Sequence, residues 1–223
     1  MFLILFSILQ LLIIGTMNMK IFNDLCKFIL ATSSKYNIDE SHDVSHSMNV
    51  LHFAHNIYEQ EVYIDPGLIP HRNIVYYAST LHDMCDKKYM DEKQGLIEIE
   101  NYLDEKITKE DSDAILSIIS TMSYSKVKKD GFPDLGIYQK AYHVVREADL
   151  LTAYDFDRCI IYDLKVNKNS FETSFYHAEE LFSRRVLQHG EDNLFTTEYA
   201  KNVYPLLHSQ SIQRINNWRK MLL

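Results

Sequence analysis

The sequence predicts an all-α fold, a single orthogonal bundle of roughly eight helices. Its 223 residues contain 6 Gly and 4 Pro, too few turn-forming residues for a sandwich or barrel of many short strands. Apolar residues also recur at steps of three and four almost throughout the chain, which is the helical period. With 46% hydrophobic and 24% charged residues, the composition is that of a globular protein with a sizeable core.

The helices follow from apolar spacing, and their ends follow from turn-forming residues. Within 42–60, an apolar arc that includes Val50, Phe53 and Ile57 predicts a largely buried helix. The same pattern recurs at 115–122 and at 144–160, and turn sequences break the chain elsewhere. The expected helices are 20–36, 41–60, 70–84, 92–104, 109–123, 137–166, 173–189 and 195–221.

Residues 1–16 are set apart from a single helical domain at 17–223, which contains no repeat, low-complexity tract or linker. The apolar run at 2–14 is shorter than the roughly 20 residues that cross a bilayer. It is either a leader that anchors the protein to a membrane or sequence that precedes the true start at Met17 or Met19. The later start is the favoured interpretation.

Charge and cysteine content restrict the classes of function. The net charge of −8 leaves no basic surface for a nucleic-acid polymer, so a bound nucleotide would need a local site or a metal. Cys26, Cys85 and Cys159 form no CxxC pair, which argues against a disulfide scaffold and against a thiolate zinc site. A reducing, cytoplasmic compartment is therefore expected, whereas the oligomeric state is left open.

Four residues of metal-ligand type occupy positions where a buried helical face calls for apolar ones. His46 lies on the stripe of Val50, His82 and Asp83 close the helix at 70–84, and Asp149 lies on the apolar side of its helix. A buried carboxylate must be paired or bind a metal. The two imidazoles and two carboxylates are therefore candidate ligands of one divalent first-row ion, with positions left for water and substrate.

Each of these residues also has a simpler interpretation. A single inward-facing histidine is more often a hydrogen-bonded core residue than a ligand, and Asp149 has Arg146 and Arg158 as candidate partners. Two adjacent residues, His and Asp, have little specificity by themselves. His55 is expected in the core. No role is predicted for the histidines without a ligand-spaced partner, His71, His143, His177, His189 and His208.

Four segments together resemble the small stand-alone HD-domain phosphohydrolases. They are S-H-D-V-S-H-S-M-N-V at 41–50, A-S-T-L-H-D-M-C-D-K-K-Y at 78–89, I-I-S-T-M-S-Y-S at 118–125 and E-A-D-L-L-T-A at 147–153. The resemblance extends from about Lys20 to the final helix. It implies an HD-type helical domain in which His46, His82, Asp83 and Asp149 are the metal ligands. The cofactor would be a divalent ion of Mn, Co, Ni, Fe, Mg or Zn.

Such a metal would lower the pKa of a bound water and polarise a phosphoryl oxygen, so that water attacks phosphorus in line. In that mechanism Asp83 orients or deprotonates the water while it coordinates the metal. Lys88 neutralises phosphate oxygens as a point charge. Asp86, Lys88 and Tyr89 match the D-x-K-[YF] element of one branch of the family. The expected catalytic residues are therefore Asp83 and Lys88.

Further substrate contacts are expected from His42, Asp86 and Lys126, in addition to Lys88. His42 precedes the first ligand by one helical turn, so it either orients that ligand, contacts phosphate, or begins the helix with Ser41 as the N-cap. Lys126 follows the M-S-Y-S segment, where a solvated loop is the simpler interpretation. Lys128 is an alternative phosphate contact in the same segment.

The chain departs from the family pattern at three positions. Asn49 replaces an arginine in the first motif, and Leu150 and Thr152 replace an arginine and an aspartate in the last. Two positive charges that could hold phosphate are thereby lost. The leading hypothesis is a metal-dependent phosphohydrolase that cleaves a phosphate ester or anhydride of a small nucleotide. The alternative is an HD-fold regulatory protein that binds metal or nucleotide with little or no turnover.

Overall fold

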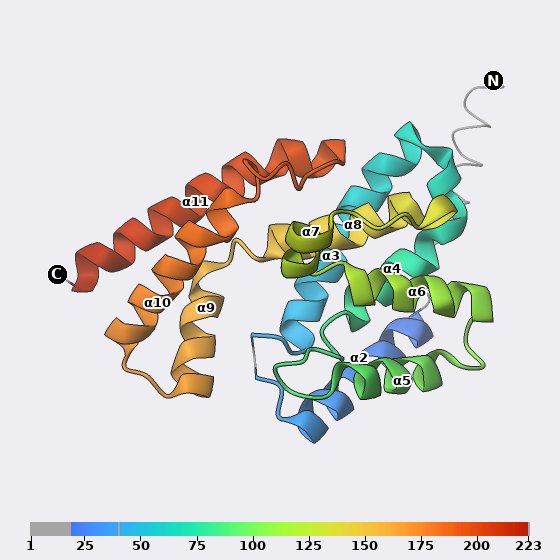
Figure 1. Cartoon of the computed structure of the whole chain (residues 1–223), viewed down its shortest axis with the longest axis horizontal. Helices are drawn as coiled ribbons and strands as arrows, with labels where there is room; N and C mark the ends of the chain where they lie inside the picture. The colour runs from blue at the N-terminus through green and yellow to red at the C-terminus, as the bar shows by residue number, and fades with distance from the viewer. Residues whose placement is uncertain (1–18, 40, 223) are drawn as a thin grey trace.

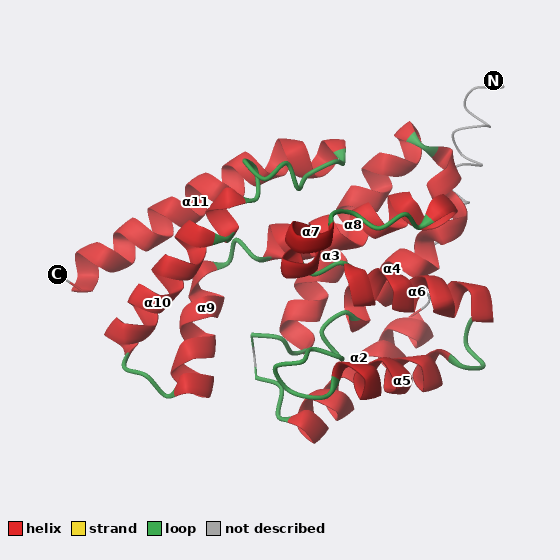
Figure 2. Ribbon diagram, viewed as in Figure 1, coloured by secondary structure: helices red, strands yellow, loops and turns green. Residues whose placement is uncertain are grey.

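The computed structural model describes residues 19–39 and 41–222, and this part of the chain contains helices and loops without a strand (Figure 2). The all-α prediction is confirmed, with ten α-helices in the described residues rather than roughly eight. They are α2 (Met19–Tyr36), α3 (Val44–Ile64), α4 (Arg72–Leu81), α5 (Glu92–Leu103), α6 (Lys109–Thr121), α7 (Tyr124–Asp130), α8 (Gln139–Thr152), α9 (Phe156–Tyr162), α10 (Phe171–Arg184) and α11 (Glu198–Leu222).

The centre of the bundle consists of α3, α4 and α8, each of which packs against the other two. The helix α6 packs against α4, α5 packs against α6, and α2 lies against both α3 and α4. The pair α9 and α10 forms a separate side of the molecule in Figure 1. The long helix α11 connects that side to the centre, because it contacts α9 and α10 as well as α3 and α8.

The second expected helix, 41–60, begins three residues later than predicted. Asp43, rather than Ser41, is the N-cap of α3, because its side chain accepts a hydrogen bond from the backbone N–H of Ser45 at 2.8 Å. Val50 and Ile57 lie in the core as expected, whereas His55 is exposed and its Nδ1 lies 2.7 Å from the hydroxyl of Tyr76. The core prediction for His55 was therefore wrong.

The long helix expected at 137–166 is two helices, α8 and α9, separated by a turn at 153–155. The backbone N–H of Ala153 still bonds to Asp149, but those of Tyr154 and Asp155 bond three residues back, which ends the α-helical pattern. Ser211 of α11 donates to the carbonyl of Tyr154 at 2.6 Å and thereby satisfies an acceptor at the break. Apolar spacing alone could not reveal this turn, because the apolar residues continue through it.

A short helix, α7, follows directly after α6 where a loop was expected. Ser123 is its N-cap, accepting a hydrogen bond from the backbone N–H of Lys126. The helix ends at Gly131, whose φ of 77° lies in the left-handed region that favours glycine. The M-S-Y-S segment is thus the junction of two helices rather than the end of one.

Glu147, a buried carboxylate of α8, is hydrogen-bonded to the segment that precedes α11. Glu147 accepts a hydrogen bond from Arg146 at 2.9 Å and further bonds from the backbone N–H and hydroxyl groups of Thr196 and Thr197 at 2.6–3.0 Å. The side chains of Glu147 and Arg146 are 0% and 1% exposed. Since a buried carboxylate is costly without donors, these bonds fix the position of α8 against the segment before α11.

No helix in the described ranges is both long enough and apolar enough to cross a membrane. The apolar run at 2–14, which raised the question of a membrane anchor, lies outside the described residues.

The ring of His189 is fully buried against Tyr124, Tyr154 and Phe195, and neither ring nitrogen has a hydrogen-bond partner among the described residues. Burial lowers the pKa of His189 to about 3. The ring is neutral in the folded protein, whereas in the unfolded chain it takes up a proton below a pH of about 6.5. Its contribution to stability is therefore complete above that pH and is lost as the pH falls.

We expect the replacement His189→Phe to reduce the acid sensitivity of folding. Between pH 7 and pH 5, protonation of His189 in the unfolded chain should remove about 2 kcal/mol of the free energy of unfolding, and the phenylalanine variant should lack this loss. Urea unfolding at the two pH values measures the difference. The exposed His52→Gln should retain the wild-type dependence, and an equal dependence in all three proteins would contradict the burial argument.

Candidate metal centre

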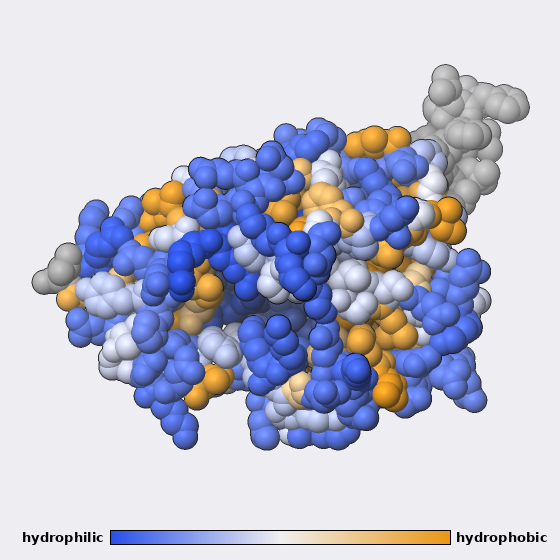
Figure 3. Space-filling model, viewed as in Figure 1, coloured by the Kyte–Doolittle hydropathy of each residue, from blue (hydrophilic) through white to orange (hydrophobic). Residues whose placement is uncertain are grey.

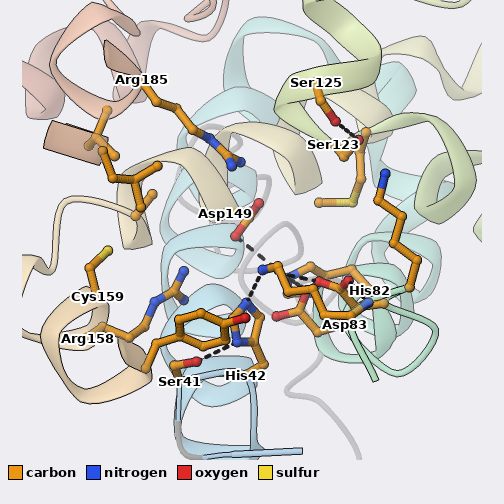
Figure 4. A pocket seen from close by; sticks show the side chains of 18 of the residues that line it. Ser41, His42, His82, Asp83, Ser123, Ser125, Asp149, Arg158, Cys159 and Arg185 are labelled. Carbon is orange, nitrogen blue, oxygen red and sulfur yellow. Dashed lines mark hydrogen bonds and ion pairs between the residues drawn. The ribbon is translucent and has the colours of Figure 1, made fainter. Parts of the chain in front are cut away.

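Three predicted ligands from three separate parts of the chain meet at one point in the protein. His46 comes from α3, His82 directly follows α4, and Asp149 comes from α8. One ligand atom from each lies within 4.8 Å of the others, and both histidines are buried. Asp149 Oδ1 lies 3.5 Å from His46 Nε2 and 3.6 Å from His82 Nε2, while the two Nε2 atoms are 3.3 Å apart. Figure 4 shows Asp149 directed toward His82.

Asp83, the fourth predicted ligand, contacts both imidazoles. Its Oδ2 lies 3.1 Å from His46 Nε2 and its Oδ1 lies 3.3 Å from His82 Nε2. Oδ2 is buried, and its contact with His46 does not have the geometry of a hydrogen bond. It has no other hydrogen-bond partner in the described part of the chain. A buried carboxylate oxygen without a hydrogen bond calls for a cation. The four side chains therefore form a donor set that suits a divalent ion.

The end of α4 explains how His82 presents its ligand nitrogen. All ten residues of α4 except Arg72 and Asn73 are buried, so the helix end is held inside the bundle. His82 Nδ1 lies 2.9 Å from the carbonyl oxygen of Ser79 and donates its proton there, since a carbonyl only accepts. In the neutral ring, the lone pair is then on Nε2, which faces the cluster. Such a backbone partner is the usual way to orient a ligating histidine.

The electrostatics of the cluster favour positive charge next to its two carboxylates. Burial alone would raise the pKa of Asp149, but hydrogen bonds to His46 and His82 lower it well below its ordinary value. Burial likewise disfavours ionised Asp83, but its histidine neighbours lower that pKa as well. For His82, burial lowers the pKa, yet the two carboxylates outweigh it and raise the pKa to about 9. The negative charges of Asp83 and Asp149 thus keep the ring of His82 protonated. A metal ion could replace that proton and offset the same two charges.

The donor set fits a metal without identifying which one. Two imidazole nitrogens and two carboxylates suit divalent first-row ions, and no cysteine contributes a thiolate. His46 and His82 would supply nitrogen, and Asp149 and Asp83 would supply oxygen.

Three residues of the cluster, His82, Asp83 and Asp149, line a cavity of about 470 Å³, a volume in the range of pockets for small molecules. In Figure 3 this face of the molecule is hollowed between the α9 and α10 side and the central helices, with hydrophilic residues around the hollow. All four residues predicted to contact substrate, His42, Asp86, Lys88 and Lys126, line the cavity. The structure thus brings the predicted ligands and the predicted substrate contacts to one place.

His42 links Lys88 to a hydrogen-bonded chain. Lys88 Nζ donates to His42 Nε2 at 2.9 Å, while His42 Nδ1 lies 3.0 Å from the hydroxyl of Tyr89 and 2.5 Å from that of Ser41. Tyr89 donates in turn to Asp39 Oδ2 at 2.5 Å. Burial, with smaller effects of nearby charges, lowers the pKa of His42 to about 4, so the ring is neutral and can accept from Lys88. His42 therefore positions Lys88 rather than beginning the helix.

Close packing holds the loop that carries Asp83 and Lys88. A Cβ atom on Gly95 would lie 2.6 Å from the Cα of Cys85, so the absence of a side chain lets α5 approach this loop. Asp91 ends the loop as the N-cap of α5 and accepts from the N–H of Gln94 at 3.0 Å.

The two lysines after the M-S-Y-S segment have different surroundings. Lys126 lines the cavity, where its Nζ lies 2.5 Å from Glu92 Oε1 and donates to the carbonyl of Ser120 at 2.7 Å. Lys128 forms an ion pair with Asp192 at 2.6 Å. Lys126 is thus the one of the two that lies near the cluster, although an acidic residue already neutralises part of its charge.

Sequence reasoning missed the role of two arginines in this cavity. Arg158 of α9 and Arg185, which follows α10, both line it. Arg158 contacts the ring of His46 instead of pairing with Asp149, and Arg146 pairs with Glu147. Neither Arg146 nor Arg158 is therefore the partner of Asp149, contrary to the simpler interpretation of that residue. Arg158 and Arg185 belong to no motif, so only the folded chain reveals that they line the cavity.

The three departures from the family pattern do not face the candidate metal centre. Asn49 and Thr152 line a second cavity, of about 380 Å³, between α3, the α8–α9 turn and α11. Leu150 is 3% exposed and belongs to the hydrophobic core. The three altered positions are thus not among the residues that line this cavity, and its cationic side chains come from other positions.

Comparison with known proteins supports the fold alone. No family model matches the chain, and no curated protein sequence matches it. The structure is similar to the crystal structure of a protein from Lactobacillus plantarum, with a TM-score of 0.68 and 19% sequence identity. The similarity covers 90% of this chain and 95% of the other. The helical bundle therefore occurs in a solved structure over nearly its whole length.

We expect His46→Gln to weaken the binding of Mn²⁺ or Co²⁺ by at least about 100-fold, because it removes one nitrogen ligand from the cluster. Isothermal titration calorimetry of the full chain measures this affinity. His52→Gln is the matched control, since it changes an exposed histidine on the same helix. Equal metal affinity in both variants and in the wild type would rule out His46 as a ligand.

Proposed function

We propose that this protein is a metal-dependent phosphohydrolase that acts on a small nucleotide, as its resemblance to the HD-domain phosphohydrolases implies. The observation that carries the proposal is the meeting of His46, His82, Asp83 and Asp149 at one point, in the motif order of that family. The cavity around them also contains cationic side chains. A metal centre next to positive charges suits the charge of a phosphoryl group.

When bound, a divalent ion would supply Lewis acidity and a water of lowered pKa. In the reaction, the water oxygen forms a bond to phosphorus as the bond from phosphorus to the leaving oxygen breaks. Asp83, which lines the cavity, accepts a proton of the attacking water, and the leaving oxygen takes the electron pair of the broken bond. Lys88, positioned by His42, donates hydrogen bonds to the phosphoryl oxygens as negative charge develops on them.

The expected substrate is a small molecule rather than a nucleic-acid polymer. The net charge of −8 opposes a long polyanion, whereas the cationic side chains of the cavity act over a short distance. A cytoplasmic location follows from the same proposal, since free nucleotides are its substrates.

The direct test is to incubate the purified chain with each of Mn²⁺, Co²⁺, Ni²⁺, Fe²⁺, Mg²⁺ and Zn²⁺ and a panel of ribo- and deoxynucleotides. Phosphate and pyrophosphate are measured separately, because they report which bond is cleaved. The double variant His82→Ala, Asp83→Ala should lose all activity. A wild type that binds metal but releases neither product from any nucleotide would favour the regulatory alternative.

We expect Lys88→Met to lower kcat/KM by about 10²-fold, because it removes a charge that stabilises the developing phosphoryl charge. Metal affinity should be unchanged, since Lys88 contacts His42 and not a ligand. Steady-state kinetics and calorimetry measure the two quantities. Lys129→Met, at a lysine 81% exposed at the end of α7, is the control. Equal kcat/KM values for the two variants would show that Lys88 has no part in the reaction.

A further inference from the structure

Arg185 reaches the candidate metal centre from the far side of the cavity. It directly follows α10, and Figure 4 shows its guanidinium directed toward Asp149. The guanidinium lies over the ring of Tyr124 at 4.8 Å from the ring centre, a cation–π contact across the cavity to α7. The Tyr124 hydroxyl donates to Asp192 at 3.0 Å, which fixes the ring beneath Arg185. The side chain is thus supported by an aromatic face.

No carboxylate among the described residues lies within ion-pair distance of Arg185. The neighbouring arginines differ in this respect: Arg184 pairs with Glu180 at 3.3 Å, and Arg214 and Arg219 pair with Asp157 and Glu179. Arg185 therefore keeps its fork of N–H donors available at the wall of a cavity. A planar fork of this kind suits the oxygens of a phosphoryl group.

Two arginines of the cavity, Arg158 and Arg185, lie on opposite sides of the cluster. In Figure 4, Arg158 and His42 lie on one side of Asp149, and Arg185 lies on the other. Lys88 belongs to the first side, because its Nζ lies 2.9 Å from His42. A phosphoryl group bound at the cluster would contact the side formed by Arg158 and Lys88. Most of the 470 Å³ would remain for the rest of the substrate. Arg185 is placed to contact the substrate group bonded to that phosphoryl group.

We propose that Arg185 binds a second phosphoryl group of the substrate, adjacent to the one that reacts at the cluster, and so selects substrates with consecutive phosphates over monophosphates. This inference rests on the proposed function for the position of the reacting group. Arg185 is then a specificity residue: it contacts the substrate but no metal ligand. Its removal should affect the binding of a two-phosphate ligand much more than that of a one-phosphate ligand.

The test uses two probes that cannot be hydrolysed, methylphosphonate and methylenebisphosphonate, which have one and two phosphoryl groups. Their affinities for the full-length chain in the same excess of Mn²⁺ are measured by calorimetry, so that chelation in solution cancels between variants. Arg185→Gln should weaken methylenebisphosphonate binding by about 10- to 100-fold, the loss of a charge-assisted hydrogen bond. Methylphosphonate binding should change by less than about threefold, and Arg185→Lys should lie between wild type and glutamine.

Arg184→Gln is the matched control, since it alters an adjacent arginine that is 71% exposed and already paired. It should leave both affinities at the wild-type values. An unchanged bisphosphonate affinity in Arg185→Gln, an equal loss for both probes, or an equal loss in Arg184→Gln would overturn the proposal. Equal wild-type affinity for the two probes would also overturn it.

The Arg185 proposal and the proposed hydrolase function can fail independently, and the experiments distinguish the two failures. A wild type that binds methylenebisphosphonate through Arg185 but hydrolyses no nucleotide would contradict the hydrolase and support the binding assignment. A protein that hydrolyses nucleoside monophosphates and triphosphates with equal kcat/KM, both before and after Arg185→Gln, would retain the hydrolase and contradict the assignment.

Discussion

The structure depends on the neutralisation of two carboxylates at the junction of α3, α4 and α8. Asp83 and Asp149 bring negative charge into the bundle, and His46 and His82 are the nearest groups that can offset it. Because each helix at the centre contributes to this cluster, none of the three can shift without leaving a buried charge unpaired. A metal would satisfy the same electrostatic need as the imidazole proton and would add chemistry. The interactions that hold the central helices together are therefore the same interactions that form the candidate metal centre.

Much of the helical content could be predicted from the sequence, because apolar residues at helical spacing mark each buried face. The prediction succeeded for α2, α5 and most of α6, where turn residues flank the apolar pattern. It failed at 137–166, where apolar residues continue through the turn at 153–155 and a hydrogen bond from Ser211 of α11 accompanies the break. Residues that are distant in the sequence contribute to such a break, and the spacing of apolar residues near the break does not reveal them.

The ligands were more predictable than their surroundings. A histidine or aspartate on an apolar stripe is costly unless it has a partner, so His46 and Asp149 stand out in the sequence itself. Arg158 and Arg185 carry no such signal, because an arginine on a helix surface or just after a helix is ordinary. Conversely, Asn49 stood out by its departure from a motif, yet it lines a different cavity. Residue type reveals buried polar groups, whereas convergence on a cavity is a property of the fold.

The hydrogen bonds of Glu147 have a consequence for the order of folding. Its partners Thr196 and Thr197 lie about fifty positions later in the chain, just before α11. During synthesis, α8 is complete well before these donors emerge, and until then Glu147 cannot be buried without cost. Asp149 is only two residues away on the same helix. The segment just before α11 is thus the one that seats α8, so the site is completed only after this later segment has been synthesised and has packed against α8.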